Sequence, residues 1–226
     1  MGAGCCCEKV IESPDLDRET LSLEEDGIED KYASSLINMK SFKIEQVLGK
    51  GAFGKVLLVS KTDSQQLFAM KVISKAKLKS HKQKVHAIAE RKILERVRSP
   101  FVVTLHFAFQ TASKLYLVVD FMSGGELFLH LRKAGKFSEE VAKFYAAEVL
   151  LAYDALHSRR IIYRDLKPEN VLLDEDGHIK LADFNLSKLA EGQVMRTFTF
   201  CGTPEYISPE VLRGEAQTKA VDFWSL

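Results

Sequence analysis

Two carboxylates and an amide stand close together in the second half of the chain: Asp165, Asn170 and Asp183. The stretch "VLLDEDGHIKLAD" after Asn170 is typical of a β-hairpin that turns at Asp176-Gly177. Asn170 then opens the first strand and Asp183 closes the second, so antiparallel pairing brings an amide oxygen beside a carboxylate. Such hard oxygen ligands suit Mg²⁺, which shares its shell with water and substrate phosphates. Any one of the three alone is ordinary turn chemistry, but together they predict a metal site.

A lysine and a glutamate fall on faces that are expected to be buried. In "LFAMKVIS" the side chains alternate, so Lys71 shares a face with Ala69 and Ile73. Glu90 lies at helical spacing with three apolar residues, Ile93, Leu94 and Val97. Burying either charge alone costs several kcal/mol, so we expect the two to pair. The alternative is that both side chains reach out to solvent.

A glycine-rich segment, "LGKGAFGKV", places Gly49, Gly51 and Gly54 in a G-x-G-x-x-G pattern. In a dinucleotide-binding fold the third glycine opens a helix. Here the β-rich run "KVLLVS" follows at once, which makes a dehydrogenase of that type a distant alternative. We expect the loop to join two strands and to lie as a flap of backbone N–H groups over phosphates. The plainer interpretation is an ordinary hairpin turn.

The elements around these residues change character along the chain, from strands to helices. Short β-rich runs and one helix come first, and a long amphipathic helix and the hairpin follow. The expected strands are 41–48, 55–60, 67–74, 101–109 and 115–122, and the expected helices are 77–99 and 138–158. The predicted fold class is α+β with two lobes, a β-rich first lobe carrying one helix and a mostly helical second lobe.

Charge is unevenly distributed, although the net charge is only +1. Residues 1–39 hold ten acids and three bases, whereas residues 40–226 hold 29 bases and 21 acids. We expect 1–40 to be a disordered acidic leader, and we expect no nucleic-acid-binding surface. No run approaches the roughly 18 apolar residues that span a bilayer. The four cysteines form neither a disulfide framework nor a zinc site, which favours a reducing, cytoplasmic setting.

From about Phe42 to Leu226, the motifs and the order in which they follow one another resemble those of eukaryotic serine/threonine protein kinases. "YRDLKPEN", "TFCGTPEY" and "GGELF" are similar to the AGC group, which includes protein kinase A, Akt and the ribosomal S6 kinases. The resemblance implies a β-rich lobe over 41–122 and a partial helical lobe over 123–226. It also implies transfer of the γ-phosphate of ATP, with Mg²⁺, to serine or threonine in proteins.

The resemblance assigns roles to individual residues. The implied ATP-binding residues are Leu48, Gly49, Gly51, Gly54, Val56, Ala69, Lys71, Val119, Asp120, Met122, Glu126 and Leu172. The implied catalytic residues are Asp165, Lys167, Lys71 and Glu90, and the implied metal ligands are Asn170 and Asp183. An internal stack of apolar side chains is implied for Leu94, Leu105, Tyr163 and Phe184.

Regulation and substrate preference are implied as well. Thr199 matches an activation phosphosite, with Arg164, Lys188 and His86 as its basic cradle, and therefore an upstream activating kinase is expected. Glu126, Glu169 and Thr203 match substrate-binding positions, and contact with the ATP ribose is an alternative for Glu126. Glu205 would add to an acidic field, with a structural role as the alternative. Such carboxylates bind guanidinium groups in a bidentate fork, so substrates with arginine upstream of the target are expected.

Three features depart from the resembled pattern. Asn185 replaces the usual glycine and Ser208 replaces the usual alanine. Asparagine tolerates left-handed φ at a cost of roughly 1–2 kcal/mol, so we expect Asn185 to bias the switch without abolishing it. Asn185 also favours an alternative function, a nucleotide-binding pseudokinase or scaffold. Finally, the position of Asp222 begins a long central helix in the family, so this chain is expected to be an incomplete, weakly active catalytic domain.

The first residues, "MGAGCCC", resemble an acylation signal. Gly2 is the position required for myristoylation, although Cys6 stands where serine or threonine is usual. Cys5, Cys6 and Cys7 are candidate palmitoylation sites, and stable anchoring needs two acyl chains. A cytoplasmic protein that can attach to the inner face of a membrane is therefore expected, with an unmodified terminus as the alternative.

Overall fold

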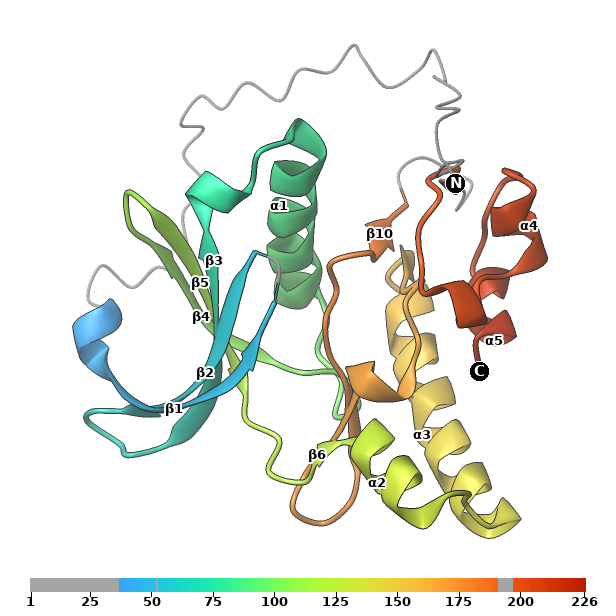
Figure 1. Cartoon of the computed structure of the whole chain (residues 1–226), viewed down its shortest axis with the longest axis horizontal. Coiled ribbons are helices and arrows are strands. Elements are labelled where there is room, and N and C mark those ends of the chain that lie inside the picture. Colours follow the sequence, from blue (N-terminus) through green and yellow to red (C-terminus); the bar gives the residue numbers. More distant parts are fainter. Residues whose placement is uncertain (1–36, 52, 191–196) are drawn as a thin grey trace, which may run out of the picture. The chain divides into compact units, whose positions relative to one another are not determined.

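A computed structural model describes residues 37–51, 53–190 and 197–226 (Figure 1). The predicted acidic leader, apart from its last residues, and the predicted acylation sites lie outside these ranges. The described residues contain a five-stranded antiparallel sheet in the order β1-β2-β3-β5-β4. Its strands are β1 (Phe42–Lys50), β2 (Gly54–Lys61), β3 (Leu67–Ser74), β4 (Leu105–Gln110) and β5 (Lys114–Asp120).

The glycine-rich loop joins β1 to β2, as predicted. Lys50 pairs with Lys55, and the Gly51 N–H donates to the Gly54 carbonyl at 3.0 Å. Gly54 also has a packing role that the motif alone does not reveal. A Cβ at this position would lie 1.8 Å from the Val72 carbonyl oxygen, so any side chain would force β2 away from β3.

One helix accompanies the sheet, and it is shorter than predicted. Helix α1 (His81–Arg96) begins at a capping box made by Ser80 and Gln83. The predicted strand over 101–109 is also too long, because β4 begins at Leu105. The preceding residues bond elsewhere: the Val103 N–H donates to the Leu181 carbonyl at 3.0 Å, and the Leu181 N–H donates to the Phe101 carbonyl at 2.9 Å. Their apolar character reflects burial in a connection, which mimics a strand in sequence.

After β5 the described residues contain four helices and several short strands (Figure 1). A three-stranded sheet in the order β6-β8-β9 contains the predicted hairpin, and β7 pairs with β10. The strands are β6 (Gly125–Glu126), β7 (Ile161–Ile162), β8 (Val171–Leu173), β9 (Ile179–Leu181) and β10 (Lys188–Leu189). The helices are α2 (Leu127–Ala134), α3 (Glu139–His157), α4 (Pro209–Leu212) and α5 (Ala220–Trp224). Short 3₁₀ turns cover Met39–Ser41, Lys75–Lys77, Pro168–Asn170 and Pro204–Tyr206.

Helix α3 and the hairpin lie close to where the sequence predicted them. Ser138 caps α3, its hydroxyl accepting from the Val141 N–H, and Glu139 and Glu140 lie in the first turn. Val171 pairs with Leu181, so the two ends of the hairpin meet. The turn is longer than a two-residue turn, because the Asp174 N–H bonds to the His178 carbonyl and Gly177 lies at a φ of +88°.

The largest apolar core joins both parts of the fold. It contains residues of α1, β4, α3 and the hairpin, including Ile93, Leu105, Tyr153 and Leu181. A second core lies in the sheet around Phe42 and Val59, and Ile37 and Met39 pack against it. Residues just before the expected boundary at 41 are therefore packed against the sheet as well. Within the described ranges, no helix is both long and apolar enough to cross a membrane.

Candidate active site

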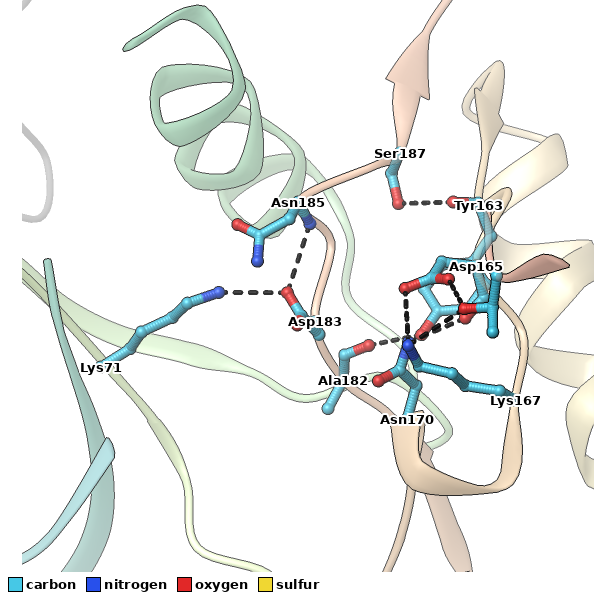
Figure 2. Close-up of polar contacts among 10 residues, drawn as sticks. Lys71, Tyr163, Asp165, Lys167, Asn170, Ala182, Asp183, Asn185 and Ser187 are labelled. Atoms are coloured by element: carbon cyan, nitrogen blue, oxygen red, sulfur yellow. Dashed lines mark hydrogen bonds and ion pairs between the residues drawn. The ribbon is translucent and has the colours of Figure 1, made fainter. Parts of the chain in front are cut away.

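Lys71 connects three elements through one ammonium group. Its Nζ lies 2.6 Å from Glu90 Oε1 on α1. It also lies 3.1 Å from Asp183 Oδ1 after β9, the contact drawn in Figure 2. The Glu90 side chain is almost fully buried, whereas Lys71 is one-quarter exposed and Asp183 is 43% exposed. The predicted pairing of Lys71 with Glu90 is therefore confirmed, and the buried stripe of α1 carries the glutamate as the helical spacing predicted.

The charge of Lys71 is maintained by its neighbours. Burial alone would lower the pKa of its ammonium group, but the carboxylates of Glu90 and Asp183 more than offset this, and the pKa is raised. Lys71 is therefore cationic at neutral pH, as a group that binds phosphate oxygens must be.

Four of the predicted ATP-binding residues share one face of the sheet. Val56 pairs with Lys71 and Ala69 pairs with Val119, so all four side chains project to the same side. Beyond residues 121–124, which link β5 to β6, Glu126 pairs with Leu172. The remaining members are Leu48 and Gly49 on β1, Gly51 in the loop, Gly54 at the start of β2, and Asp120 and Met122 at the end of β5 and just beyond it.

In the loop 164–169, called the catalytic loop below because the resemblance implies a catalytic role for Asp165, hydrogen bonds hold Asp165 to Asn170. The Asn170 Nδ2 donates to the Asp165 backbone carbonyl at 2.8 Å and to its Oδ2 at 2.9 Å. Both residues are buried. Because the amide nitrogen is bound in this way, the Asn170 Oδ1 is left as an acceptor, and Figure 2 shows it on the side that faces Asp183.

Asn170 and Asp183 come from the two ends of the hairpin, and a backbone hydrogen bond joins these ends. The Ala182 N–H donates to the Asn170 carbonyl at 2.9 Å. This bond holds Asn170 next to the residue before Asp183. An amide oxygen and a half-exposed carboxylate are donors that Mg²⁺ accepts together with water and phosphate oxygens. The residues present fit the metal site that the sequence predicted, although Asn170 lies in a 3₁₀ turn just before the strand.

Thr203 links the catalytic loop to the later segment. Its hydroxyl donates to Asp165 Oδ1 at 3.0 Å and accepts from Lys167 Nζ at 3.1 Å. Lys167 Nζ also lies 3.6 Å from Asp165 Oδ2. The resemblance implied a substrate-binding role for Thr203, but nothing in the sequence indicated this hydroxyl bridge, because 38 residues separate Thr203 from Asp165.

Asp222 braces the backbone of the catalytic loop. Its Oδ1 accepts from the Arg164 N–H at 2.7 Å, and its Oδ2 accepts from the Tyr163 N–H at 2.9 Å and lies 2.7 Å from His157 Nε2. Arg164 has a φ of +67° and Asp183 a φ of +53°, in the left-handed region that side chains with a Cβ avoid. Such conformations cost roughly 1–2 kcal/mol and persist where surrounding contacts fix them.

Asn185 is not strained. Among the described non-glycine residues, those with left-handed φ are Gln65, Arg160, Arg164 and Asp183. Asn185 therefore does not pay the conformational cost of a left-handed φ that the sequence suggested. Its backbone N–H lies 3.4 Å from Asp183 Oδ1 (Figure 2). An asparagine fits this backbone as well as a glycine does.

The four residues of the implied apolar stack all lie in the main core. Leu94, Leu105, Tyr163 and Phe184 all belong to it, and the rings of Tyr163 and Phe184 meet edge to face at 5.2 Å. The Tyr163 hydroxyl donates to the Ala182 carbonyl. Phe184 is fully buried, which fixes the residue next to Asp183.

The residues expected to cradle a phosphate on Thr199 lie in several elements, and Arg164 is engaged elsewhere. The Thr199 carbonyl accepts from Gln217 Nε2 at 2.9 Å, and its hydroxyl lies 3.5 Å from that of Thr197. Arg164 Nε donates instead to the Leu186 carbonyl at 2.8 Å. Lys188 lies in β10, and His86 lies in α1. Glu169 and Glu205 each lie in a 3₁₀ turn near the catalytic loop or Thr203.

Asp120 has a structural role that the sequence did not indicate. Its Oδ1 lies 2.6 Å from His106 Nε2, and its Oδ2 accepts from Lys180 Nζ at 2.6 Å and from the Thr104 N–H at 2.9 Å. Burial would raise the pKa of this carboxyl, but His106, Lys180 and the Thr104 amide outweigh it and hold the pKa well below its usual range. The side chain is therefore ionised and fully engaged.

Comparison with known proteins matches this architecture to one family. The protein kinase domain family matches residues 42–226. The chain is 54% identical to Protein kinase 2 of Dictyostelium discoideum over 82% of its length, and 50% identical to the serine/threonine-protein kinase gad8 of Schizosaccharomyces pombe over 85%. It is 52% identical to the ribosomal protein S6 kinase beta of Caenorhabditis elegans over 84%. The chain belongs to the protein kinase family, and these relatives are serine/threonine kinases of the AGC type.

The chain spans only about a third of the length of these relatives. It covers 38%, 34% and 35% of the three proteins, respectively. Residues 42–226, which the family matches, contain every residue of the candidate active site described above. The family implies ATP and a divalent metal as well as protein substrates.

Proposed function

We propose that this domain transfers the γ-phosphoryl group of ATP to serine or threonine hydroxyls of proteins. The observation that carries the proposal is the double ion pair of Lys71 with Glu90 and Asp183. It joins the sheet face that would hold the nucleotide to the loop that would hold the metal. Phosphoryl transfer depends mostly on such positioning and on neutralising charge.

The chain's own residues divide the chemistry between them. Asp165 orients the substrate hydroxyl and takes its proton as the oxygen bonds to the γ-phosphorus and the bond to the departing ADP oxygen breaks. Lys167, 3.6 Å from Asp165, offsets the charge that builds on the transferred group. Lys71 holds the α- and β-phosphates. Asn170 and Asp183 would hold Mg²⁺, which would neutralise phosphate charge when bound.

The test is transfer of labelled phosphate from ATP to a basic peptide, with and without Mg²⁺. We expect Mg²⁺-dependent transfer by the parent and a loss of at least 100-fold in the Asp165→Asn variant, the range in which general bases contribute. The Asp154→Asn variant, at an exposed position on α3, serves as the matched control. Transfer by the Asp165→Asn variant at the parental rate would remove the assignment.

A nucleotide-binding scaffold without transfer is the second candidate. It was raised by Asn185, which replaces the usual glycine. Because Asn185 adopts an unstrained backbone conformation, the observation that favoured the scaffold carries less weight. The two candidates differ in outcome: a scaffold binds ATP and gives no labelled peptide.

We also propose activation by phosphorylation of Thr199. A phosphate adds about −1.5 to −2 charge and would draw Arg164, Lys188 and His86 toward it. Because Arg164 now bonds to the Leu186 carbonyl, the modification would have to rearrange this contact. Mass spectrometry of the active enzyme should find Thr199 phosphorylated by an upstream kinase, and fully active protein with an unmodified Thr199 would contradict the proposal.

Substrates are proposed to carry arginine upstream of the target. Glu126, Glu169 and Glu205 supply carboxylates that can bind guanidinium groups. A peptide library should show this preference for upstream arginine. The Glu169→Gln variant should lose more turnover on arginine-containing peptides than on a short neutral peptide. Selection of acidic residues upstream would refute the proposal.

Membrane attachment through the first residues is a separate proposal. Gly2 would carry a myristoyl chain and Cys5, Cys6 or Cys7 a palmitoyl chain, because one chain alone binds only marginally. The acidic leader repels anionic lipids, so the acyl chains must supply the affinity. A Gly2→Ala protein expressed in eukaryotic cells should leave the membrane fraction, and unchanged partitioning would contradict the proposal.

A further inference from the structure

The carboxylate of Asp120 lies where the five-stranded sheet ends and the linker 121–124 to β6 begins. Its backbone N–H donates to the Thr104 carbonyl at 3.2 Å, and its side chain accepts from the Thr104 N–H at 2.9 Å. His106 Nε2, at 2.6 Å from Oδ1, orients the carboxylate, and the His106 ring packs edge-on to Phe68 at 4.9 Å. Asp120 is thus fixed to the sheet from three directions.

The remaining contact of this carboxylate is with a residue outside the five-stranded sheet. Lys180 Nζ lies 2.6 Å from Asp120 Oδ2, and Lys180 belongs to β9 of the three-stranded sheet. Only 22% of the Lys180 side chain and 19% of the Asp120 side chain are exposed. An ion pair shielded to this degree is screened less by salt than a surface pair, and its geometry is fixed by the hydrogen bonds around it.

Strand β9 leads directly to the proposed metal ligand. Leu181, next to Lys180, is fully buried and bonds through its backbone to Phe101 and Val103. Asp183 follows two residues later and reaches Lys71. A shift of β9 relative to the end of β5 would therefore change the spacing between the nucleotide face of the sheet and Asp183.

We propose that the Asp120–Lys180 ion pair is a clasp across the linker, and that Lys180 is a positioning residue for the nucleotide site. The clasp holds the end of β5 against β9, so that the linker opens less often and a bound nucleotide leaves more slowly. Lys180 does not touch the reacting atoms in this role. The inference rests on the proposed function, since it assigns a regulatory contact to the same nucleotide site.

The experiment measures binding of a non-hydrolysable ATP analogue with Mg²⁺ by calorimetry in the full chain. In the Lys180→Met variant we expect the Kd to rise about 5-fold or more, the lower end of typical coupling between sites. Lys180→Arg keeps the charge and should bind within about 2-fold of the parent. The control is Lys143→Met, which removes the exposed Lys143–Glu139 pair, also 2.6 Å long, and should bind like the parent.

A double-mutant cycle shows whether the two residues act as one unit. If they do, Asp120→Asn together with Lys180→Met should weaken binding no more than the worse single variant does. Additive losses would show that each residue acts alone, and the clasp would be wrong. Binding by Lys180→Met that equals that of the parent, even with a lowered Tm, would mean that the pair serves stability only and would also overturn the clasp.

Amide hydrogen exchange separates this inference from the proposed function. Without nucleotide, residues 121–124 should exchange faster in Lys180→Met than in the parent or in Lys143→Met, measured well below each Tm. If the parent fails to bind the ATP analogue, the proposed function fails, and the exchange result still decides whether the clasp restrains the linker. Equal exchange in all three proteins overturns the clasp.

Discussion

The Thr203 hydroxyl donates a hydrogen bond of 3.0 Å to Asp165 Oδ1 and accepts one of 3.1 Å from Lys167 Nζ. A residue outside the catalytic loop therefore fixes the orientation of the proposed base. A rotation of the Asp165 carboxylate would break this bond or the bond from Asn170 Nδ2 to Oδ2. The arrangement makes the base rigid before any substrate binds, which is the condition for efficient proton transfer.

Replacing Thr203 by valine should lower kcat/KM by about 10-fold or more. A hydrogen bond to a charged group contributes about 1.5–3 kcal/mol, and about 1.4 kcal/mol corresponds to tenfold in rate. Steady-state kinetics on a basic peptide check this. The Thr203→Ser variant keeps the hydroxyl and should remain near the parent. Parental kinetics in the valine variant would show that the bond is dispensable.

Replacing Asp222 by alanine should destabilise the domain strongly. The Tyr163 and Arg164 N–H groups are buried and would lose their acceptor, which costs roughly 1–3 kcal/mol for each. For a chain of this size, about 1 kcal/mol lowers Tm by roughly 2–4 °C. Calorimetry of Asp222→Ala against Asp154→Ala measures the difference. Equal melting temperatures would argue against the brace.

Stability should depend on pH through His178. Its Nδ1 lies 2.5 Å from Glu148 Oε1 on α3, and this hydrogen bond raises the pKa of His178 above 6.5. A raised pKa in the folded state means that the stabilisation is complete below the unfolded value and is lost as pH rises through the folded one. As pH rises from about 6, just below the ordinary value of histidine, through the folded pKa, the parent should therefore lose more stability than His178→Gln. If the Tm of the two proteins changed equally with pH over this range, the assignment would be contradicted.

Restoring glycine at Asn185 should have little effect on turnover. Because Asn185 is not left-handed, glycine relieves no strain there and instead adds freedom to the unfolded chain, at a cost of roughly 0.5–1 kcal/mol. A slightly lower Tm with unchanged kcat is the expected result. A large increase in kcat in Asn185→Gly would show that asparagine restrains the enzyme and would favour the scaffold.

Local patterns predicted those parts of the site that depend on a single element. The alternation of β3 placed Lys71, and the helical spacing of α1 placed Glu90, so their pairing followed from the cost of burying each charge alone. The hairpin brought Asn170 toward Asp183 because its register is set by a short turn. In each case a few neighbouring residues determine the geometry.

Contacts between distant segments escaped prediction for a physical reason. Asp120 and Lys180 are separated by 60 residues and lie in different sheets, and neither has a local pattern that marks it as buried. The same holds for Thr203 with Asp165. The run 101–104 was predicted as strand because apolar residues are common to strands and to buried connections, and its partners, at Leu181, lie far along the chain.

Arg164 and Asp183 both hold left-handed backbone conformations that glycine adopts without strain. A laboratory evolution experiment that rewards heat resistance alone would therefore be drawn toward glycine at these two positions. Each such glycine would remove a guanidinium or a carboxylate that the proposed chemistry requires. Screening for a more robust domain should accordingly include a phosphotransfer assay in every round, because at these positions the two properties are expected to select opposite residues.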